Sequence, residues 1–250
     1  MVLYIALLYL FYPIWVLLAP AKKIGGKRAR VAVKQYKKVI FCCNHRAISD
    51  LFVTATATRK YAHYMVKKEW VQSSFFSRLL VKIFSAIQVE RGAADLAAFR
   101  SAKKYLGKNQ CICIFPEGTR SKGKFGPLGE IRQGALMFSV KFDTPIVPMY
   151  VYKKPRFLGF GNAVLMGDAM DMSAIYAANK AADPLGACAD ALSNELNKLR
   201  LLLDRAIQSK GKERRKLFKR LRNPAFSTAE IYDALKEVLP PLPPPVRGGE

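Results

Sequence analysis

The chain has 250 residues, of which 51% are hydrophobic, enough to bury one substantial core, so we expect one main domain with small appendages. Its 42 Lys and Arg residues against 18 Asp and Glu give a formal charge of +24, which favours an anionic partner: an acidic substrate, an anionic membrane or a nucleic acid. The five cysteines include no second ligand pair at zinc spacing, so the composition does not indicate a metal site.

The first predicted element is a hydrophobic membrane-anchoring helix at the N-terminus, over residues 1–21. Residues 2–20 carry no charge and would span roughly 28 Å as a helix, close to the hydrocarbon thickness of a bilayer. Pro13 leaves a kinked or re-entrant segment as open as a straight one, and a buried core helix is a further alternative. Positive charge follows this segment instead of preceding it, which argues against a signal peptide and predicts that the rest of the chain lies on the cytoplasmic face of the membrane. The basic stretch, 22–37, is interpreted as a linker.

Over 38–208 short apolar runs alternate with longer helical patterns, which is typical of β-α units. We expect strands at 39–43, 64–66, 87–90, 110–115, 145–152 and 163–166. Helices are expected at 50–58, 70–86, 93–106 and 131–142, with one or two more over 185–222. The predicted fold class is α/β, with a mostly parallel or mixed central sheet flanked by helices.

The C-terminal part is predicted to be a basic helical region over 209–238, followed by a Pro-rich disordered tail over 239–250. In 210–222 basic side chains alternate with the apolar residues Leu217, Phe218 and Leu221. Such a helix suits an anionic membrane surface, and a solvated helix is the equally weighted alternative.

Polar residues 44–50 follow the first predicted strand of the domain and contain His45 and Asp50. On a regular helix two residues five apart would point about 140° away from each other, so the pair can meet only if the histidine precedes the helix that begins at the aspartate. Asp50 would then hold the imidazole, and the other ring nitrogen could take a proton from a hydroxyl group. A helix-capping aspartate beside an incidental histidine is the alternative. The other histidine, His63, has no carboxylate motif nearby and is interpreted as structural or interfacial.

A second polar segment, 115–121, follows the predicted strand 110–114. Gly118 would let backbone amides approach an anion, Arg120 offers a bidentate fork for phosphate, and Thr119 adds a hydroxyl group. We expect Glu117 either to orient Arg120 or to bind an acceptor hydroxyl. The alternative is a charged surface turn.

Together these two segments, 72 residues apart, resemble motifs of the glycerolipid acyltransferase family, which includes bacterial 1-acylglycerol-3-phosphate (lysophosphatidic acid) acyltransferases. The resemblance covers about residues 38–170, because 89–92 resembles another family motif and 146–148 a fourth. Two positions depart from the usual pattern: Ala47 stands where serine is frequent, and Arg132 where lysine is usual. These departures bear on the identity of the acceptor more than on acyl transfer.

The resemblance implies that His45 and Asp50 activate an acceptor hydroxyl for direct attack on an acyl thioester, without an acyl-enzyme and without a metal or other cofactor. It also implies a site for the glycerol phosphate of the acceptor. Arg91 is open to a second interpretation, an ion pair with Glu90 or with a neighbouring helix. The predicted substrate-binding residues are Lys67, Arg91, Glu117, Gly118, Thr119, Arg120 and Arg132.

The function expected from this resemblance is 1-acylglycerol-3-phosphate O-acyltransferase, an enzyme of phospholipid biosynthesis that makes phosphatidic acid. Its partners would be a lysophospholipid acceptor, acyl-CoA or acyl carrier protein as donor, and an anionic membrane. Transfer to another lysolipid or to glycerol-3-phosphate stays open, as does a hydrolase that uses the same pair on a thioester or lipid ester. Specific nucleic-acid binding is not expected, because the sequence has no helix-turn-helix, RNP-like or zinc pattern.

Overall fold

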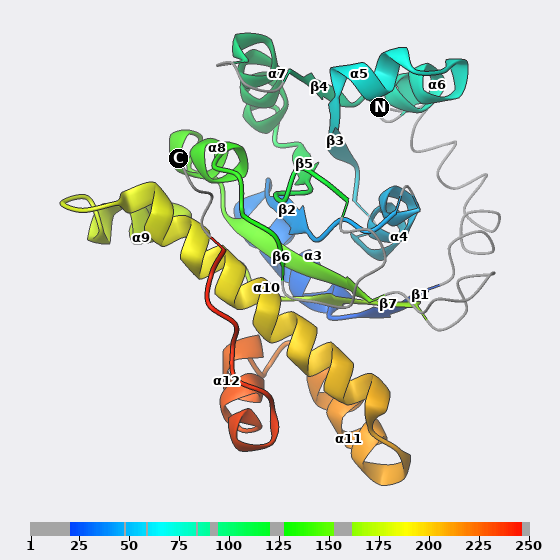
Figure 1. Ribbon diagram of the computed structural model, residues 1–250, viewed down its shortest axis with the longest axis vertical. Coiled ribbons are helices and arrows are strands. Elements are labelled where there is room, and N and C mark those ends of the chain that lie inside the picture. Colours follow the sequence, from blue (N-terminus) through cyan, green and yellow to red (C-terminus); the bar gives the residue numbers. More distant parts are fainter. Residues whose placement is uncertain are drawn as a thin grey trace.

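In the described part of the chain, seven strands form one sheet (Figure 1). The computed structural model describes residues 21–47, 49–58, 60–83, 85–90, 95–120, 128–152 and 162–246. The strands are β1 (Ala21–Ile24), β2 (Ile40–Cys43), β3 (Ala62–Lys67), β4 (Ile87–Val89), β5 (Cys111–Ile114), β6 (Ile146–Tyr152) and β7 (Asn162–Met166). Their order is β1-β7-β6-β2-β5-β3-β4, and only the β6–β7 pair is antiparallel. The predicted mixed α/β sheet is therefore confirmed.

Helices cover both faces of this sheet, because its strands are apolar on both sides. One face packs against α3 (Gly26–Tyr36) and α4 (Asp50–Thr58), and the other against α7 (Leu96–Gly107), α8 (Gly134–Lys141) and α10 (Pro184–Gln208). Along β6, Val147, Met149 and Val151 belong to the first core, whereas Ile146 and Tyr150 belong to the second. In Figure 1, α10 crosses the second face diagonally.

Most elements expected over 38–208 are present, with ends that differ by a few residues. The helix expected at 50–58 has these bounds in the structure. The helix expected at 70–86 is two helices, α5 (Lys68–Gln72) and α6 (Phe75–Ile83). A short helix, α9 (Met172–Ala178), was not expected; the Asp171 side chain caps it by accepting from the backbone amide of Ala174.

The stretch interpreted as a basic linker, 22–37, instead forms most of β1 and all of α3. β1 pairs in parallel with β7 and makes one edge of the sheet. α3 buries Ala29, Ala32 and Val33 against the first core, while its lysines lie on the exposed side. Most of these basic residues therefore lie on the exposed side of a packed helix, and the folded domain begins before residue 38.

The C-terminal region contains α11 (Gly211–Arg222) and α12 (Thr228–Asp233), which both pack against α10 (Figure 1). α12 begins with a capping box between Ser227 and Glu230. The predicted tail starts with structure, since Leu239 is buried and Leu242 packs against the second core.

The predicted membrane anchor, 1–21, lies almost entirely outside the described residues, which begin at Ala21. Among the helices that are described, none combines the length and the apolar character needed to cross a bilayer.

Candidate active site

Most of the predicted catalytic and binding residues that the structure describes lie at or just beyond the carboxyl ends of parallel strands. Since β2, β3 and β5 are parallel neighbours, their carboxyl ends lie at the same edge. The loop after β2 carries His45, the loop after β5 carries Glu117 and Arg120, and β3 ends at Lys67. The fold thus brings segments together that are far apart in the sequence.

His45 and Asp50 are paired as the spacing predicts. The histidine lies in the turn after β2 and the aspartate is the first residue of α4. Nδ1 of His45 is 3.1 Å from Oδ2 of Asp50, whose side chain is fully buried. The same oxygen accepts the backbone amides of Arg46 and Ala47, at 2.6 and 2.7 Å. Because this oxygen accepts from three donors, Nδ1 carries its hydrogen and Nε2 is the basic atom of the ring.

The imidazole is further held by Phe115, at the end of β5. The two rings stack with centroids 4.1 Å apart and planes 20° from parallel. The His45 side chain is only 19% exposed, so the ring is fixed from one side by an aromatic face and from another by a carboxylate. Such a ring needs little reorganisation before it takes a proton.

Glu117 joins the two loops instead of projecting into solvent. Its Oε1 accepts the backbone amide of His45 at 3.2 Å, and its Oε2 accepts the amide of Gly129 at 3.0 Å. The residue is 6% exposed. Neither role expected from the sequence, orienting Arg120 or binding an acceptor hydroxyl, is the one these contacts describe. In the structure the carboxylate positions the backbone of the histidine loop.

The residues expected to contact phosphate differ in their conformation and exposure. Gly118 has a φ of 62°, a left-handed conformation that glycine adopts without strain, and it turns the chain just before Thr119 and Arg120, which are exposed. Lys67 is half-buried at the end of β3. Arg91 lies outside the described residues.

Arg132 is tied to the second loop by its backbone and not by its side chain. Its amide donates to the carbonyl oxygen of Pro116 at 2.9 Å, which brings the residue close to the Glu117 segment. Its guanidinium is 67% exposed and lies 3.6 Å from Glu130. A surface ion pair of this kind is weak, so the guanidinium can exchange it for another anion.

Two supports of the histidine loop were not recognised in the sequence. The Asn44 side chain exchanges hydrogen bonds with the backbone of Val151 on β6, at 3.1 and 2.7 Å. Arg46 donates to the Tyr150 hydroxyl at 2.8 Å, and burial raises the pKa of that tyrosine to about 12. Both contacts span more than 100 residues, so only a three-dimensional register of β2 beside β6 could have identified them.

His63 lies in the interior, as expected for a structural residue. Its Nδ1 is 2.9 Å from the carbonyl oxygen of Ser85, its Nε2 is 3.0 Å from the side chain of Gln110, and its ring stacks on Tyr105. Burial lowers the pKa of His63, so the ring is neutral at physiological pH.

The cysteines offer no activated nucleophile. All five are free and buried, and burial raises the pKa of each thiol, to about 12 for Cys113 and well above the ordinary value for Cys42 and Cys43. Thiolate is the reactive form, so these groups are inert. Within the ranges that the structure describes, no group of three or more His, Cys, Asp or Glu residues has an arrangement that could hold a metal ion.

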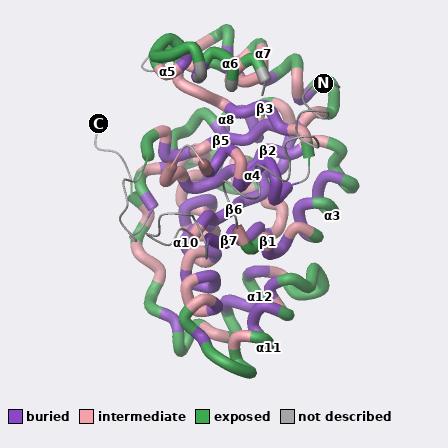
Figure 2. Tube along the Cα trace, turned by 90° about the vertical axis from the view of Figure 1, so that its right-hand side faces the viewer, coloured by how far each residue is buried: buried purple, intermediate pink, exposed green. Residues whose placement is uncertain are grey.

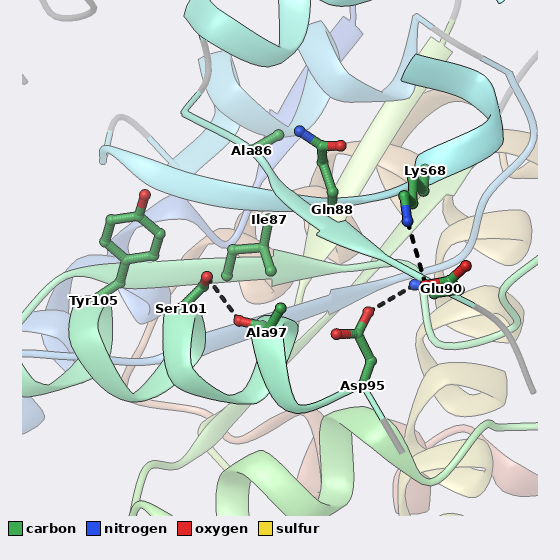
Figure 3. Close-up of a pocket in the computed structure, with 9 residues that line it drawn as sticks. All are labelled: Lys68, Ala86, Ile87, Gln88, Glu90, Asp95, Ala97, Ser101 and Tyr105. Atoms are coloured by element: carbon green, nitrogen blue, oxygen red, sulfur yellow. Dashed lines mark hydrogen bonds and ion pairs between the residues drawn. The ribbon is translucent and has the colours of Figure 1, made fainter. Parts of the chain in front are cut away.

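A cavity of about 350 Å³ lies along β4, the last strand of the sheet, between this strand and α7 (Figure 3). Lys68 pairs with Glu90 at its rim, and Asp95 accepts the Glu90 amide at 2.7 Å. Its lining does not include His45 or Asp50, and two strands, β5 and β3, separate β4 from β2.

Comparison with known proteins decides the family. A family model described as Acyltransferase matches residues 27–152, just over half of the chain and a range that contains all nine predicted site residues. The chain belongs to the acyltransferase family. The resemblance inferred from the motifs is thereby confirmed, and the pair His45 and Asp50 lies inside the matched range of this acyltransferase.

Relatives of this acyltransferase carry a more specific name. The 1-acyl-sn-glycerol-3-phosphate acyltransferase of Bacillus subtilis (strain 168) is 25% identical over 189 residues, which cover 70% of this chain and 92% of that protein. The protein of the same name from Cocos nucifera is 31% identical over 115 residues, which cover 45% of this chain but only 36% of that protein.

A solved structure matches the fold of the acyltransferase. The crystal structure of the 1-acyl-sn-glycerophosphate (LPA) acyltransferase from Thermotoga maritima superposes with a TM-score of 0.50, covering 84% of this chain and 96% of that one. The sequence identity is 14%, so this likeness bears on the fold alone.

Proposed function

We propose that this acyltransferase moves a fatty acyl group from an acyl thioester to the free sn-2 hydroxyl of 1-acylglycerol-3-phosphate and so makes phosphatidic acid. The observation that supports this most directly is the contact between Nδ1 of His45 and the buried Asp50, on a loop that Glu117 ties to the Gly118–Arg120 turn. The acceptor is the one for which the relatives are named. The donor is acyl-CoA or acyl carrier protein.

The proposed step uses His45 first as a base and then as an acid. Nε2 takes the proton of the acceptor hydroxyl while the oxygen attacks the thioester carbonyl. The tetrahedral intermediate then expels the thiol sulfur, which receives the proton back from the imidazolium, and an oxygen ester replaces the thioester. Asp50 stays ionised and stabilises the imidazolium through Nδ1. No acyl-enzyme forms, in keeping with the burial of all five thiols.

Phosphate recognition is assigned to the basic groups at the same edge. Arg120 is exposed next to the Gly118 turn, and Arg132 has only a weak surface partner, so both can turn toward a lipid phosphate. Lys67 and Thr119 complete the proposed set, and Arg91 joins it by resemblance to the family motif.

The proposed location is the cytoplasmic face of a membrane. Two features of the sequence support it: the uncharged stretch 2–20 and the basic residues that follow it. A lipid acceptor also requires access to a bilayer. The net charge of +24 would raise the local concentration of both anionic substrates, the lipid phosphate acceptor and the thioester donor.

The test is thiol release from palmitoyl-CoA, or from the corresponding acyl carrier protein thioester, in detergent micelles with and without 1-acylglycerol-3-phosphate. We expect acceptor-dependent release that His45→Ala abolishes and that Lys104→Ala, an exposed change on α7, leaves intact. Release that is independent of the acceptor and yields free fatty acid would identify a hydrolase instead. Release that His45→Ala does not change would show that the proposed base is wrong.

A further inference from the structure

α11 carries a continuous row of positive charge on its outer side. Its residues Lys212, Arg215, Lys216, Lys219 and Arg222 follow the helical spacing of three or four positions, with Arg215 and Lys216 adjacent. This spacing places them on one face of the helix, and all five are exposed. None of them forms an ion pair in the part of the chain that the structure describes. We call this face the α11 basic surface.

The opposite side of α11 is buried in the protein interior. Leu217, Phe218 and Leu221 are 6%, 8% and 0% exposed and belong to the second core. The Arg28 guanidinium, reaching from α3, binds the carbonyl oxygens of Leu221 and Asn223 at the end of the helix. The sequence suggested a helix with an apolar face that could enter lipid, but that face is already packed, so α11 can dock only through charge.

The α11 basic surface lies close to the first described strand of the chain. α11 packs against β1, and Nζ of Lys22 lies 5.4 Å from the centre of the Phe218 ring. β1 begins at Ala21, directly after the uncharged stretch 2–20 of the sequence, so the first described strand lies beside α11. β1 is antiparallel to β2 within the sheet, so Ala21 also lies at the edge where β2 ends and the His45 loop begins.

We infer that the α11 basic surface binds the headgroups of an anionic bilayer and helps to hold the catalytic edge against the membrane that supplies the acceptor. This inference rests on the proposed function for its purpose, but its test requires no turnover. A nucleic acid could bind the same charges. It would not explain why they lie beside β1, the strand that directly follows an uncharged stretch of bilayer length in the sequence. Salt screens charge interactions beyond about one Debye length, so the basic surface acts only on a partner close to it. A membrane anchor at the proposed N-terminal segment would hold the bilayer at such a distance.

The experiment measures how close α11 lies to the lipid headgroups. A donor dye is placed at Gln208→Cys, an exposed position just before α11, since the five native thiols are buried. The full chain is reconstituted into vesicles of phosphatidylcholine alone or with one-third phosphatidylglycerol, both with a headgroup-linked acceptor dye. A first variant replaces Lys212, Arg215, Lys216 and Lys219 by Gln. A matched control, the α7 variant, replaces by Gln four exposed residues of α7 and its C-cap: Arg100, Lys103, Lys104 and Lys108.

Both variants lose four charges, and α7 and α11 lie at opposite ends of the molecule (Figure 2). At about fivefold per basic residue near an anionic surface, the four side chains of α11 favour docking by on the order of several hundredfold. We expect higher energy transfer in the anionic vesicles than in the neutral ones. This difference should vanish in the α11 variant and in 1 M salt, and persist in the α7 variant.

Three results would overturn the inference. One is equal transfer in the two kinds of vesicle, and another is an equal loss in both variants, which would mean that only the total charge matters. The third is the absence of a lipid effect together with binding of single-stranded RNA that the α11 variant loses. Acceptor-dependent thiol release in micelles, measured on the same variants, shows separately whether the proposed reaction holds.

Discussion

Asp50 binds both the His45 ring and the loop that carries this ring through one carboxylate oxygen. Oδ2 accepts from Nδ1 of His45 and from the amides of Arg46 and Ala47. Asp50→Asn removes the charge that stabilises the imidazolium and presents an N–H or a weaker acceptor to Nδ1. We expect kcat to fall by about three to four orders of magnitude, as is typical when the orienting acid of a catalytic histidine is lost. A fall of less than tenfold in a folded variant would remove Asp50 from the mechanism.

Glu117, in the second motif, has two possible roles that kinetics can distinguish. The sequence predicts a residue that contacts substrate, whereas the structure shows a buried carboxylate bound to the amides of His45 and Gly129. If it positions the histidine loop, Glu117→Gln loses one charge-assisted contact and kcat falls about ten- to hundredfold with little change in KM for the acceptor. If it binds the acceptor, KM rises instead. Steady-state kinetics on 1-acylglycerol-3-phosphate distinguishes the two, and Glu237→Gln, an exposed change in the C-terminal region, is the control.

The difference between these two residues shows how far motif reasoning reaches. The contact of His45 with Asp50 is local, so the strand-to-helix turn between them could be predicted from spacing alone. The contact of Glu117 with His45 spans 72 positions and depends on the neighbouring ends of β2 and β5. Sequence identified Glu117 as important but could not identify what it touches.

At the scale of elements, Arg28 joins α3 to the C-terminal helices. Its guanidinium pairs with Asp168 at 3.1 Å and donates to the carbonyl oxygens of Leu221, Asn223 and Phe226. The residue is 4% exposed, so its removal leaves several buried acceptors without a donor. We expect Arg28→Met to lower the free energy of unfolding by about 3–5 kcal/mol.

Urea unfolding measures this loss, and limited proteolysis locates it. Cleavage should become faster near α11 and α12, the helices that Arg28 anchors. Arg30→Met is the matched control, because Arg30 is an exposed arginine of the same helix and its loss should change stability by less than about 0.5 kcal/mol. Equal effects of the two changes would show that Arg28 is not an anchor.

The elements that the sequence did not predict share a physical cause. β1 has four residues, two of them lysines, and gains its place only by pairing with β7 at the far edge of the sheet. α3 buries only a short stripe of small apolar side chains, Ala29, Ala32 and Val33, among four basic residues, so this stripe is weak as a pattern. By contrast β2, β5 and β6 are continuous apolar runs that are buried on both faces, and these were predicted within about a residue of their ends.

At the scale of the whole molecule, the fold class followed from the alternation of apolar runs and helical patterns, but the strand order did not. The antiparallel β7 lies between β1 and β6, so the first strand of the described chain forms an edge of the sheet next to the last strand. This arrangement brings α11 beside β1, which no local pattern specifies. The positive charge consequently gathers on helices at the surface while the sheet interior stays apolar.

The net charge of +24 predicts that stability depends on ionic strength. Like charges are closer together in the folded chain than in the unfolded one, so their repulsion disfavours folding, and salt screens it. We expect Tm in neutral detergent to rise by about 2–4 °C between 20 and 300 mM sodium chloride for each kcal/mol of repulsion that is screened. The four-residue α7 variant, with Gln at Arg100, Lys103, Lys104 and Lys108, should have the higher Tm at low salt and the smaller increase. A Tm that falls with salt would mean that attractive ion pairs outweigh this repulsion. The α7 variant would then have a lower Tm than the wild type at low salt. The sign of this Tm difference therefore shows whether repulsion or attractive ion pairing dominates.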